Sequence, residues 1–194
     1  EAWHDASGNN HDAIQTTAQA QPRLHADKDI AAVRFDGIDD SLANTSWAAD
    51  LGEVTIIVVA AVQSNAGDWR GFLALNADKQ NDYTSGLTLD LGPFASQRFE
   101  SLNPEGVGFG GAADVFEDAH DFGTMHTLSF TTKPGKGQTR AFIDGKPTQA
   151  RDRTDSKLRA DRLTIGARFF NNAGPAETHG PIEADFAEVL IYDR

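Results

Sequence analysis

The residues whose spacing most resembles that of a catalytic pair are acids near the C-terminal end of the chain. Glu183, Asp185 and Glu188 follow the pattern E-x-D-x-x-E. Two glutamates can serve as nucleophile and acid/base of a retaining glycosidase where their carboxyl groups are about 5 Å apart. Sugar clefts of that kind have tryptophan-rich surroundings, which this part of the chain lacks. We therefore predict that the chain is not an enzyme, and we keep hydrolysis by Glu183 and Glu188 as an alternative.

Aromatic and amide side chains in the predicted loops suit a different task, the binding of a sugar. A pyranose ring has an apolar face that stacks on an aromatic ring and a rim of hydroxyl groups that planar polar groups can bond. Trp69 stands at a predicted loop–strand junction, and Tyr83 stands in a polar loop. Phe169 and Phe170 cannot both point into a core if their strand alternates, so one of them is expected to be exposed or covered by a neighbouring loop. The predicted ligand site consists of Trp69, Tyr83, Asn81, Arg168, Phe170 and Asn171.

Aspartates in turn-like segments supply the hard oxygen ligands that calcium prefers. Asp5 and Asp12 lie near the start of the chain, and Asp36, Asp39 and Asp40 surround an Asp-Gly turn. Their spacing matches no defined calcium loop, and an Asp-Gly turn needs no ion. We expect turn formation to be the first role of these acids, with one structural calcium ion as the alternative.

Length, charge and composition exclude several classes of partner. The 194 residues fit one domain, residues 1–194, which can bury a core without disulfides, and the chain contains no cysteine. A net charge of −12 repels phosphate backbones, so no nucleic acid is expected. The longest apolar run, Val54 to Val62, is half of what a membrane span needs, so no membrane partner is expected. Basic residues between Arg151 and Arg168 are interleaved with aspartates, which predicts a solvated connection.

Short β-rich runs separated by Gly, Asp or Asn turns recur along the chain, and this pattern predicts an all-β sandwich. The run 54–62 is apolar on both faces and is expected in the middle of a sheet, covered on both sides. In 87–91, leucines alternate with Thr88 and Asp90, which predicts a strand with one solvent-exposed face. One helical turn is expected at 46–51, and a long functional or mobile loop at 103–125. The predicted strands are 31–35, 54–62, 71–75, 87–91, 98–102, 127–132, 140–144, 162–167 and 184–192.

Three segments, in order along nearly the whole chain, resemble one family. They are Trp3 to Ala13 (WHDASGNNHDA), Ala32 to Asp40 (AVRFDGIDD) and Asp185 to Arg194 (DFAEVLIYDR). They are similar to the opening, the second signature and the closing strand of concanavalin A-like lectin/glucanase domains of the laminin-G-like type. The resemblance implies an all-β, two-sheet antiparallel jelly-roll sandwich.

The same resemblance implies structural roles for several of the acids named above. It explains Asp185 and Glu188 as parts of the closing strand, whereas laminarinase-type glycoside hydrolases, which share this fold, carry E-x-D-x-x-E in mid-chain. Related sandwiches often hold one structural calcium ion where the first and last strands meet. The resemblance therefore implies a calcium site at Asp5, Asp36 and Asp193.

Segments in the middle of the chain narrow the resemblance. Asn81 to Leu87, Leu102 to Gly106 and Thr164 to Arg168 resemble the lectin-like module of large planctomycete-type multidomain proteins that also carry cytochrome c-like domains. This implies a non-catalytic module of an exported protein, with carbohydrate as its ligand. Because the chain begins with Glu and no signal peptide precedes it, we expect a piece excised from a longer protein.

These observations predict a carbohydrate-binding, lectin-like module of a larger exported bacterial protein, at an extracellular or periplasmic location. Its expected partners are a polysaccharide or glycan and the other domains of the parent protein. One alternative is a structural or protein-interaction domain that packs against its neighbours, which predicts an apolar surface patch of several hundred Å². The second alternative is the glycoside hydrolase with Glu183 and Glu188.

Overall fold

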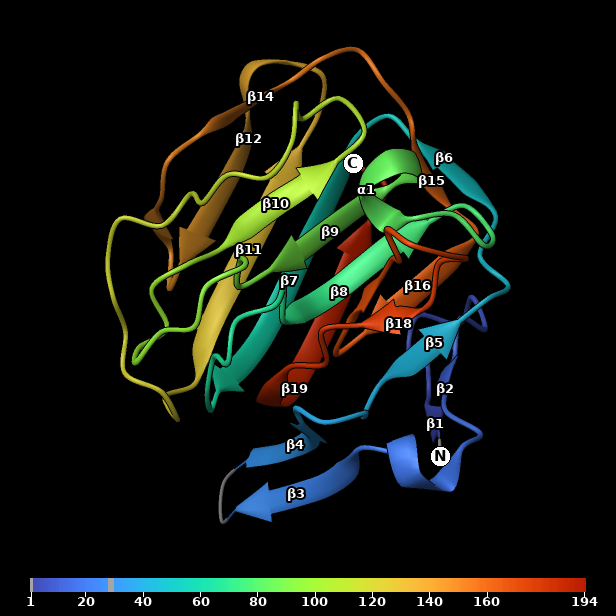
Figure 1. The fold of residues 1–194 in the computed structure, drawn as a ribbon, viewed down its shortest axis with the longest axis vertical. Coiled ribbons are helices and arrows are strands. Elements are labelled where there is room, and N and C mark those ends of the chain that lie inside the picture. The colour runs from blue at the N-terminus through green and yellow to red at the C-terminus, as the bar shows by residue number, and fades with distance from the viewer. Residues whose placement is uncertain (1, 28–29) are drawn as a thin grey trace.

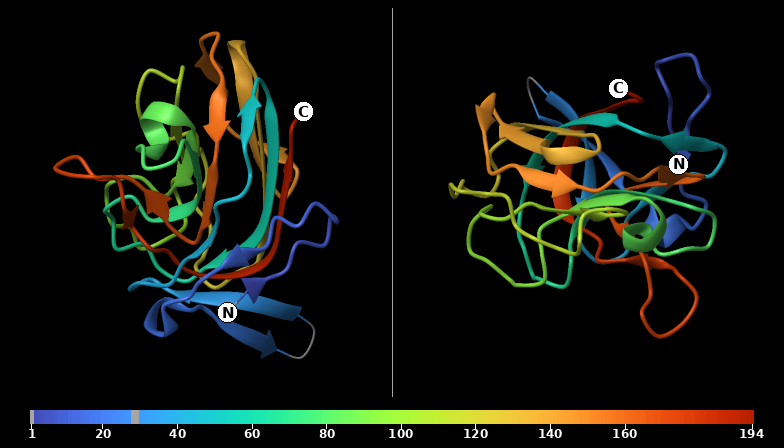
Figure 2. Two further views of the ribbon diagram at one scale, coloured as in Figure 1. Left: turned by 90° about the vertical axis from the view of Figure 1, so that its right-hand side faces the viewer. Right: turned by 90° about the horizontal axis from the view of Figure 1, so that it is seen from above.

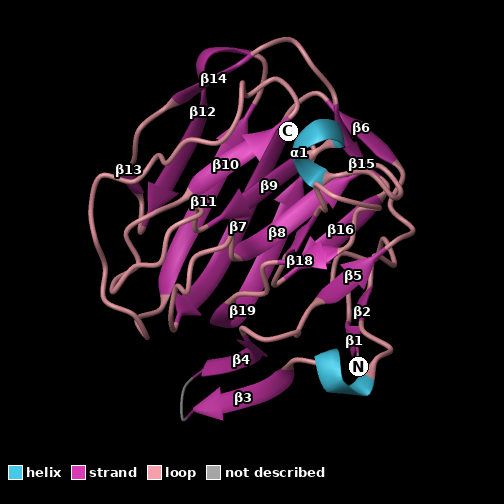
Figure 3. Ribbon diagram, in the orientation of Figure 1, coloured by secondary structure: helices cyan, strands magenta, loops and turns pink. Residues whose placement is uncertain are grey.

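The computed structural model describes residues 2–27 and 30–194, and its strands form two large antiparallel sheets (Figure 1, Figure 3). The sheets face each other as two layers, seen along their edges in the left panel of Figure 2. The predicted all-β, two-sheet antiparallel sandwich is thus confirmed. The first sheet has the strand order β1 (Ala2–Trp3), β2 (Ala13–Ile14), β5 (Leu42–Asn44), β16 (Arg162–Ile165), β8 (Gly71–Asn76), β9 (Leu87–Asp90) and β10 (Asn103–Gly106).

The second sheet contains the longest strands, and its central strand β7 (Val54–Val62) has the predicted bounds. Ile56 and Val58 point inward and are fully buried, whereas Ile57 and Val59 point outward and are half-buried. The outer face of β7 is therefore covered only in part, and the prediction of cover on both sides was too strong. The strand order is β13 (Lys146–Pro147), β12 (Gly135–Ile143), β11 (His126–Thr132), β7, β19 (Glu183–Tyr192), β4 (Ile30–Asp36) and β3 (Arg23–Asp27), and β14 (Arg151–Arg153) pairs with β12.

The small elements differ most from the sequence-based expectation. The helical turn predicted at 46–51 is wrong, because 49–51 pairs with 158–160 and cross-strand pairing overrides a weak helix signal. Among the described residues, no helix is long and apolar enough to cross a membrane. These elements are the ladder β6 (Ala49–Leu51) with β15 (Leu158–Ala160), the ladder β17 (Arg168–Phe169) with β18 (Thr178–His179), the 3₁₀ helix η1 (Ala18–Ala20) and the helix α1 (Asp82–Ser85).

The edge strand here is β10, at residues 103–106, and the strand predicted at 98–102 is wrong. That segment makes one isolated bridge, between Phe99 and His120, and the chain then pairs with β9 from Asn103 onward. Pro104 made this stretch resemble a loop, but β10 ends the strand order of its sheet. An edge position tolerates the missing N–H of proline.

Aromatic rings join the two layers at the centre of the core. Phe72 on β8 lies 6.0 Å from Phe186 on β19, and Phe186 lies 5.0 Å from Phe35 on β4, measured between ring centroids. All three are fully buried. Burial of one such side chain stabilises the fold by about 2–3 kcal/mol. This packing gives the loops above the first sheet a rigid support.

Candidate functional site

Arg168, the first residue of β17, lies at the centre of a buried ionic cluster and is 1% exposed. Its Nε and Nη2 atoms donate to the two carboxylate oxygens of Asp82, at 3.2 and 2.8 Å. Nη1 donates to Asp90 Oδ2 at 3.0 Å, and Nη2 donates also to Glu105 Oε2 at 3.1 Å. The acids come from α1, β9 and β10, so one guanidinium ties together three segments. We call these four residues the Arg168 cluster.

Close backbone packing fixes the position of the cluster. A Cβ atom on Gly71, the first residue of β8, would lie 2.5 Å from the backbone nitrogen of Arg168, so a larger residue would displace the arginine. The carboxylate of Asp82 also accepts the next backbone N–H of β17, at 2.9 Å. Across β9 and β10, Asn103 pairs with Asp90 and donates Nδ2 to its Oδ1 at 3.1 Å. The cluster is thus held from the helix, from the sheet and from the chain segment that carries Arg168.

Burial sets the charges of the cluster. It raises the pKa of Asp90 to about 7, while the charge of Arg168 and the N–H of Gly92 act in the opposite direction. For Arg168 itself, burial lowers the pKa, but the hydrogen bond with Asp82 and the charges of the three acids outweigh it and raise the pKa above its ordinary value. Arg168 therefore stays charged, and Asp90 changes protonation near neutral pH.

Three aromatic rings surround the Arg168 guanidinium. The distances from its carbon to the ring centroids are 4.5 Å for Phe170, 5.4 Å for Trp69 and 5.8 Å for Tyr83. Phe170 is 6% exposed and also packs against His179, at 4.4 Å between centroids. Trp69 and Tyr83 are half-buried, so each presents part of a ring to solvent. Both rings therefore lie within 6 Å of the same buried guanidinium.

Amide side chains join the loops beside Tyr83. The Nδ2 of Asn81 donates to the Tyr83 hydroxyl at 3.1 Å, and that hydroxyl donates to Oδ1 of Asn172 at 2.6 Å. The backbone nitrogen of Asn171 donates to Oδ1 of Asn81 at 3.0 Å. These bonds link the loop between β8 and α1 to the loop after β17. The polar groups of both loops lie next to the aromatic rings.

The loop that carries Trp69 is strained. Trp69 and Asp68 both have positive φ angles, 60° and 61°, although neither is a glycine. The backbone nitrogen of Trp69 donates to the carbonyl of Gly92 at 3.0 Å, and a Cβ on Gly180 would lie 2.2 Å from the Trp69 carbonyl oxygen. Such residues cost on the order of 1–3 kcal/mol each and concentrate at ligand sites. The surrounding loops hold Trp69 in a conformation that its own backbone disfavours.

All six residues of the predicted ligand site lie in or around the Arg168 cluster, but two of them lie too deep to touch a ligand. Arg168 is buried because the three acids consume its donors, and Phe170 is buried beneath Tyr83 and His179. Neither Phe169 nor Phe170 is exposed, and each is covered by neighbouring side chains, as the sequence allowed. Phe169 is 9% exposed, and the guanidinium of Arg162 lies 4.3 Å from its ring centroid.

Sequence analysis missed the acids of the cluster. The alternation in 87–91 predicted that Asp90 lies on a solvent-exposed face of the sheet. Thr88 and Asp90 are instead fully buried, because α1 and β17 cover that face. The solvated connection predicted between Arg151 and Arg168 is wrong for its two buried arginines, Arg153 and Arg168, whereas Asp152, Asp155 and Lys157 are exposed. The sequence around these acids carries no local signal for the cluster, because Asp82, Asp90 and Glu105 meet Arg168 only through the fold.

The turn after β4 gathers acids that fit a cation. Among the residues that the structure describes, Asp36, Asp39 and Asp40 form the one group of three ligands whose atoms lie within 4.8 Å of one another. Asp36 Oδ1 accepts the backbone N–H of Ile38 at 2.8 Å, and Asp40 Oδ2 accepts that of Asp36 at 3.0 Å. These bonds support the turn-forming role, and calcium binding stays a prediction.

The predicted calcium site at Asp5, Asp36 and Asp193 is wrong as a set. Asp36 pairs with the first residue of β19, whereas Asp193 follows its last residue. A ten-residue strand is about 30 Å long, so the two acids are far apart. The carboxylate of Asp5 accepts backbone N–H groups of His11 and Ser7 in its own loop, and these bonds lower its pKa to about 2.

The acids of the E-x-D-x-x-E pattern share the outer face of the second sheet. The intervening Ala184 and Phe186 point into the core, and a bulge between Phe186 and Glu188 turns Glu188 outward. Arg34 donates to both oxygens of Asp185 at 2.6 Å, and the Ser64 hydroxyl bonds Glu183. In this described part of the sheet, the strand partners of the three acids include no aromatic residue. They are Asp36, Arg34, Ala61 and Val59.

Comparison with known proteins identifies the fold. No protein-family model and no curated protein sequence matches the chain. The heptameric SAP-like pentraxin of Limulus polyphemus superposes with a TM-score of 0.64 at 10% identity, covering 88% of this chain and 79% of the pentraxin. A Trypanosoma rangeli sialidase superposes with a TM-score of 0.60 at 11% identity, covering all of this chain and 28% of the sialidase. The receptor binding domain of botulinum neurotoxin type G gives a TM-score of 0.57 at 7% identity, covering 100% and 47%.

At these identities the likeness concerns the fold alone. The two packed antiparallel sheets form a jelly-roll sandwich of the concanavalin-like type, as predicted from the sequence. The chain spans little more than a quarter of the sialidase, 28% of its length.

Proposed function

We propose that this chain is a non-catalytic carbohydrate-binding module of the laminin-G-like type, and that a glycan binds the surface over the Arg168 cluster. The module belongs to a larger exported protein and acts outside the cytoplasm. One observation carries the proposal. Trp69 and Tyr83, both half-buried, contact the same buried guanidinium and lie beside the linked amides of two loops.

The geometry suggests how a sugar is held. The exposed parts of the two rings stack against the apolar face of a pyranose. An amide group has two donor hydrogens and two acceptor lone pairs. Asn171 uses one donor on Glu177, at 2.9 Å, and one lone pair on Ala173, at 2.8 Å, so it retains capacity for a hydroxyl group. The cluster below keeps these groups in place before binding, which lowers the entropic cost.

The chain offers a matched control for the test, because it contains two tyrosines, Tyr83 and Tyr192. Tyr192 is exposed at the end of β19 on the second sheet. We expect wild-type protein to bind at least one structure on an array of plant and algal glycans. Trp69→Ala and Tyr83→Ala should each weaken that binding about tenfold or more, and Tyr192→Ala should leave it unchanged. An array without a single binding glycan, or equal losses for all three variants, contradicts the proposal.

One observation favours hydrolysis as a second candidate function. The bulge in β19 places Glu183 and Glu188 on one face of the sheet, as a retaining pair requires. The bidentate bond from Arg34 to Asp185 and the lack of aromatic strand partners there count against it. Release of reducing sugar from a glycan, abolished by Glu183→Gln, would establish the second candidate. Absence of release from every glycan that the protein binds would remove it.

A further inference from the structure

Phe94, in the loop after β9, is the most exposed large apolar side chain in the described part of the chain, at 82%. Its neighbours Pro93 and Ala95 are exposed as well. An exposed aromatic ring forgoes the stabilisation that burial would bring. The proposed glycan surface, formed by Trp69, Tyr83 and the amides beside them, does not yet include this ring. Its position relative to Trp69 gives it a role.

The segments before β8 and after β9 continue the ladder of these two strands. The backbone N–H of Trp69 donates to the carbonyl of Gly92 at 3.0 Å. A Cβ atom on Gly67 would lie 3.1 Å from the carbonyl carbon of Phe94. Phe94 is therefore opposite Gly67, two residues from Trp69 across the ladder.

A buried amide holds the loop of Phe94 in place. Asn65 is 5% exposed, and its Nδ2 donates to the carbonyl of Phe94 at 3.1 Å and to Ser96 Oγ at 3.0 Å. Its Oδ1 accepts the backbone N–H of Gly67 at 2.9 Å. One side chain thus joins the segment of Trp69 to the loop of Phe94. Because the backbone that carries the exposed ring is already fixed, a ligand that stacks on it loses little affinity to ordering.

The segment that carries Trp69 has neighbours on both sides. Gly71, at its end, pairs on one side with Asp90 of β9 and on the other, through an isolated bridge, with Pro181. Pro181 follows β18, which pairs with β17, the strand of the Arg168 cluster. Trp69 therefore belongs to the middle one of three adjacent segments, and Phe94 to an outer one. Paired segments lie about 4.8 Å apart, so the three span about 10 Å.

The charges beside Trp69 favour an uncharged ligand. Arg168 is engaged by three acids, and Arg70 donates Nε to the carbonyl of Gly67 at 2.8 Å and Nη1 to that of Pro181 at 3.0 Å. The side chain of Asp68, by contrast, is 67% exposed. The whole chain has a net charge of −12, and a field of this sign repels anionic polymers. A sugar chain without carboxylate or sulfate groups fits these charges.

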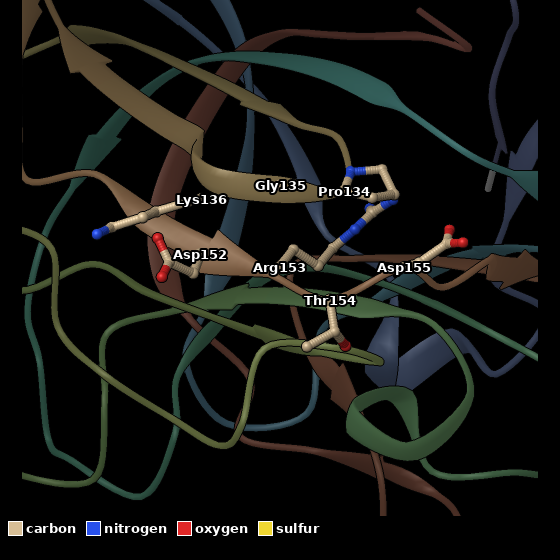
Figure 4. Close-up of a pocket in the computed structure, with 7 residues that line it drawn as sticks. All are labelled: Pro134, Gly135, Lys136, Asp152, Arg153, Thr154 and Asp155. Atoms are coloured by element: carbon tan, nitrogen blue, oxygen red, sulfur yellow. The ribbon is translucent and has the colours of Figure 1, made fainter.

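Two hollows in the protein share no residue with the three aromatic residues. One of about 480 Å³ lies between residues 134–136, around the start of β12, and residues 152–155, around the end of β14 (Figure 4). The other, of about 250 Å³, involves residues 53–55, 131–133, 138, 140 and 194. Trp69, Tyr83 and Phe94 line neither of them. Rings on adjacent segments suit the length of a sugar chain better than a single sugar enclosed in a pocket.

We propose that the glycan surface continues from Trp69 onto Phe94, and that its ligand is an uncharged polysaccharide bound along its chain. Separate sugar units stack their apolar faces on the rings, so a longer chain makes more contacts than a single sugar. This inference rests on the proposed function, to which it adds the class of glycan and a third aromatic residue.

Calorimetric titration of the full chain with a series of oligosaccharides tests the proposal. The probes are cello-, laminari- and xylo-oligosaccharides, from the monosaccharide to the hexasaccharide, with alginate oligosaccharides as the anionic comparison. For at least one uncharged series, we expect the affinity to rise about tenfold or more from the disaccharide to the hexasaccharide, because the longer chain reaches a further ring. The alginate series should bind more weakly at every length.

Variants at Phe94 separate stacking from simple exposure. Phe94→Ala should weaken hexasaccharide binding about threefold to tenfold and leave disaccharide binding unchanged, whereas Phe94→Trp should retain both. Leu24→Ala is the matched control, because Leu24 is also exposed, at 70%, but lies on β3 of the second sheet. It should leave both affinities within error.

The outcomes distinguish the two proposals. Absence of binding to these oligosaccharides and to every glycan of the array overturns both. Binding that Trp69→Ala weakens, but that depends neither on chain length nor on Phe94, overturns this proposal alone. Binding confined to the alginate series does the same.

Discussion

Arg168 and Arg153 are equally buried, each 1% exposed, yet they have opposite surroundings. Arg168 makes ion pairs with Asp82, Asp90 and Glu105, whereas Arg153 contacts two backbone carbonyl groups and has two nitrogen atoms without partners. Burial alone therefore does not assign a role to an arginine. The partners of its nitrogen atoms do: a guanidinium bonded to three acids supports the structure, whereas one with unpaired donors is a cost to it.

The largest effect is expected from Arg168→Met. The variant leaves Asp82 and Asp90 buried without their cation, and the free energy of unfolding should fall by about 3–5 kcal/mol. Denaturant unfolding followed by tryptophan fluorescence measures the loss. Arg98→Met is the control, because it breaks an exposed ion pair with Asp121 and should change the midpoint little. A loss below about 1 kcal/mol would show that the cluster is not the support we describe.

Protonation of Asp90 gives the next largest effect. Folding raises its pKa from 3.8 to about 7 because of burial. Between these values the folded chain holds a proton that the unfolded chain has released, so this group makes stability fall as the pH rises, by at most about 1.4 kcal/mol per pH unit. Asp90→Asn should flatten the dependence between pH 4 and pH 7. Unfolding curves at several pH values test this, and an unchanged slope would assign the dependence to other groups.

Arg153→Met sharpens the comparison because its predicted result is opposite to that of Arg168→Met. Replacement of an unpaired buried charge by an apolar side chain should leave stability unchanged or raise it, by up to about 2 kcal/mol. Thermal unfolding of the variant and of the wild type measures the difference. A loss as large as that of Arg168→Met would mean that the two arginines are equivalent.

A smaller effect is expected from Tyr83→Phe. The variant keeps the ring and removes the hydroxyl that accepts from Asn81 and donates to Asn172. The free energy of unfolding should fall by about 0.5–1.5 kcal/mol, and the ring face remains for stacking. Denaturant unfolding gives the first quantity and glycan affinity the second. A complete loss of glycan binding would show that the hydroxyl, and not the ring, carries recognition.

The sequence predicts the sandwich and its central strand well, because β-rich runs and turns are local signals. The bounds of β7 agree with the run 54–62, and the six predicted ligand residues gather in one place. The role of Asp90 could not be predicted. Alternation shows that its side chain points away from the core face of the sheet, but it does not show which other elements cover the opposite face. Asp193 was placed beside Asp36 by resemblance, whereas strand length and direction set them at opposite ends of β19.

The central claim is that the surface around Trp69 binds a sugar, and the three tryptophans of the chain allow a direct test. Trp3 and Trp47 pack against the core, away from the Arg168 cluster. Their indole N–H signals can be followed by NMR during titration with soluble plant and algal oligosaccharides. We predict that a binding oligosaccharide shifts the Trp69 signal in a saturable way and leaves the other two in place. Binding that moves Trp3 or Trp47 while Trp69 stays unchanged would contradict the account.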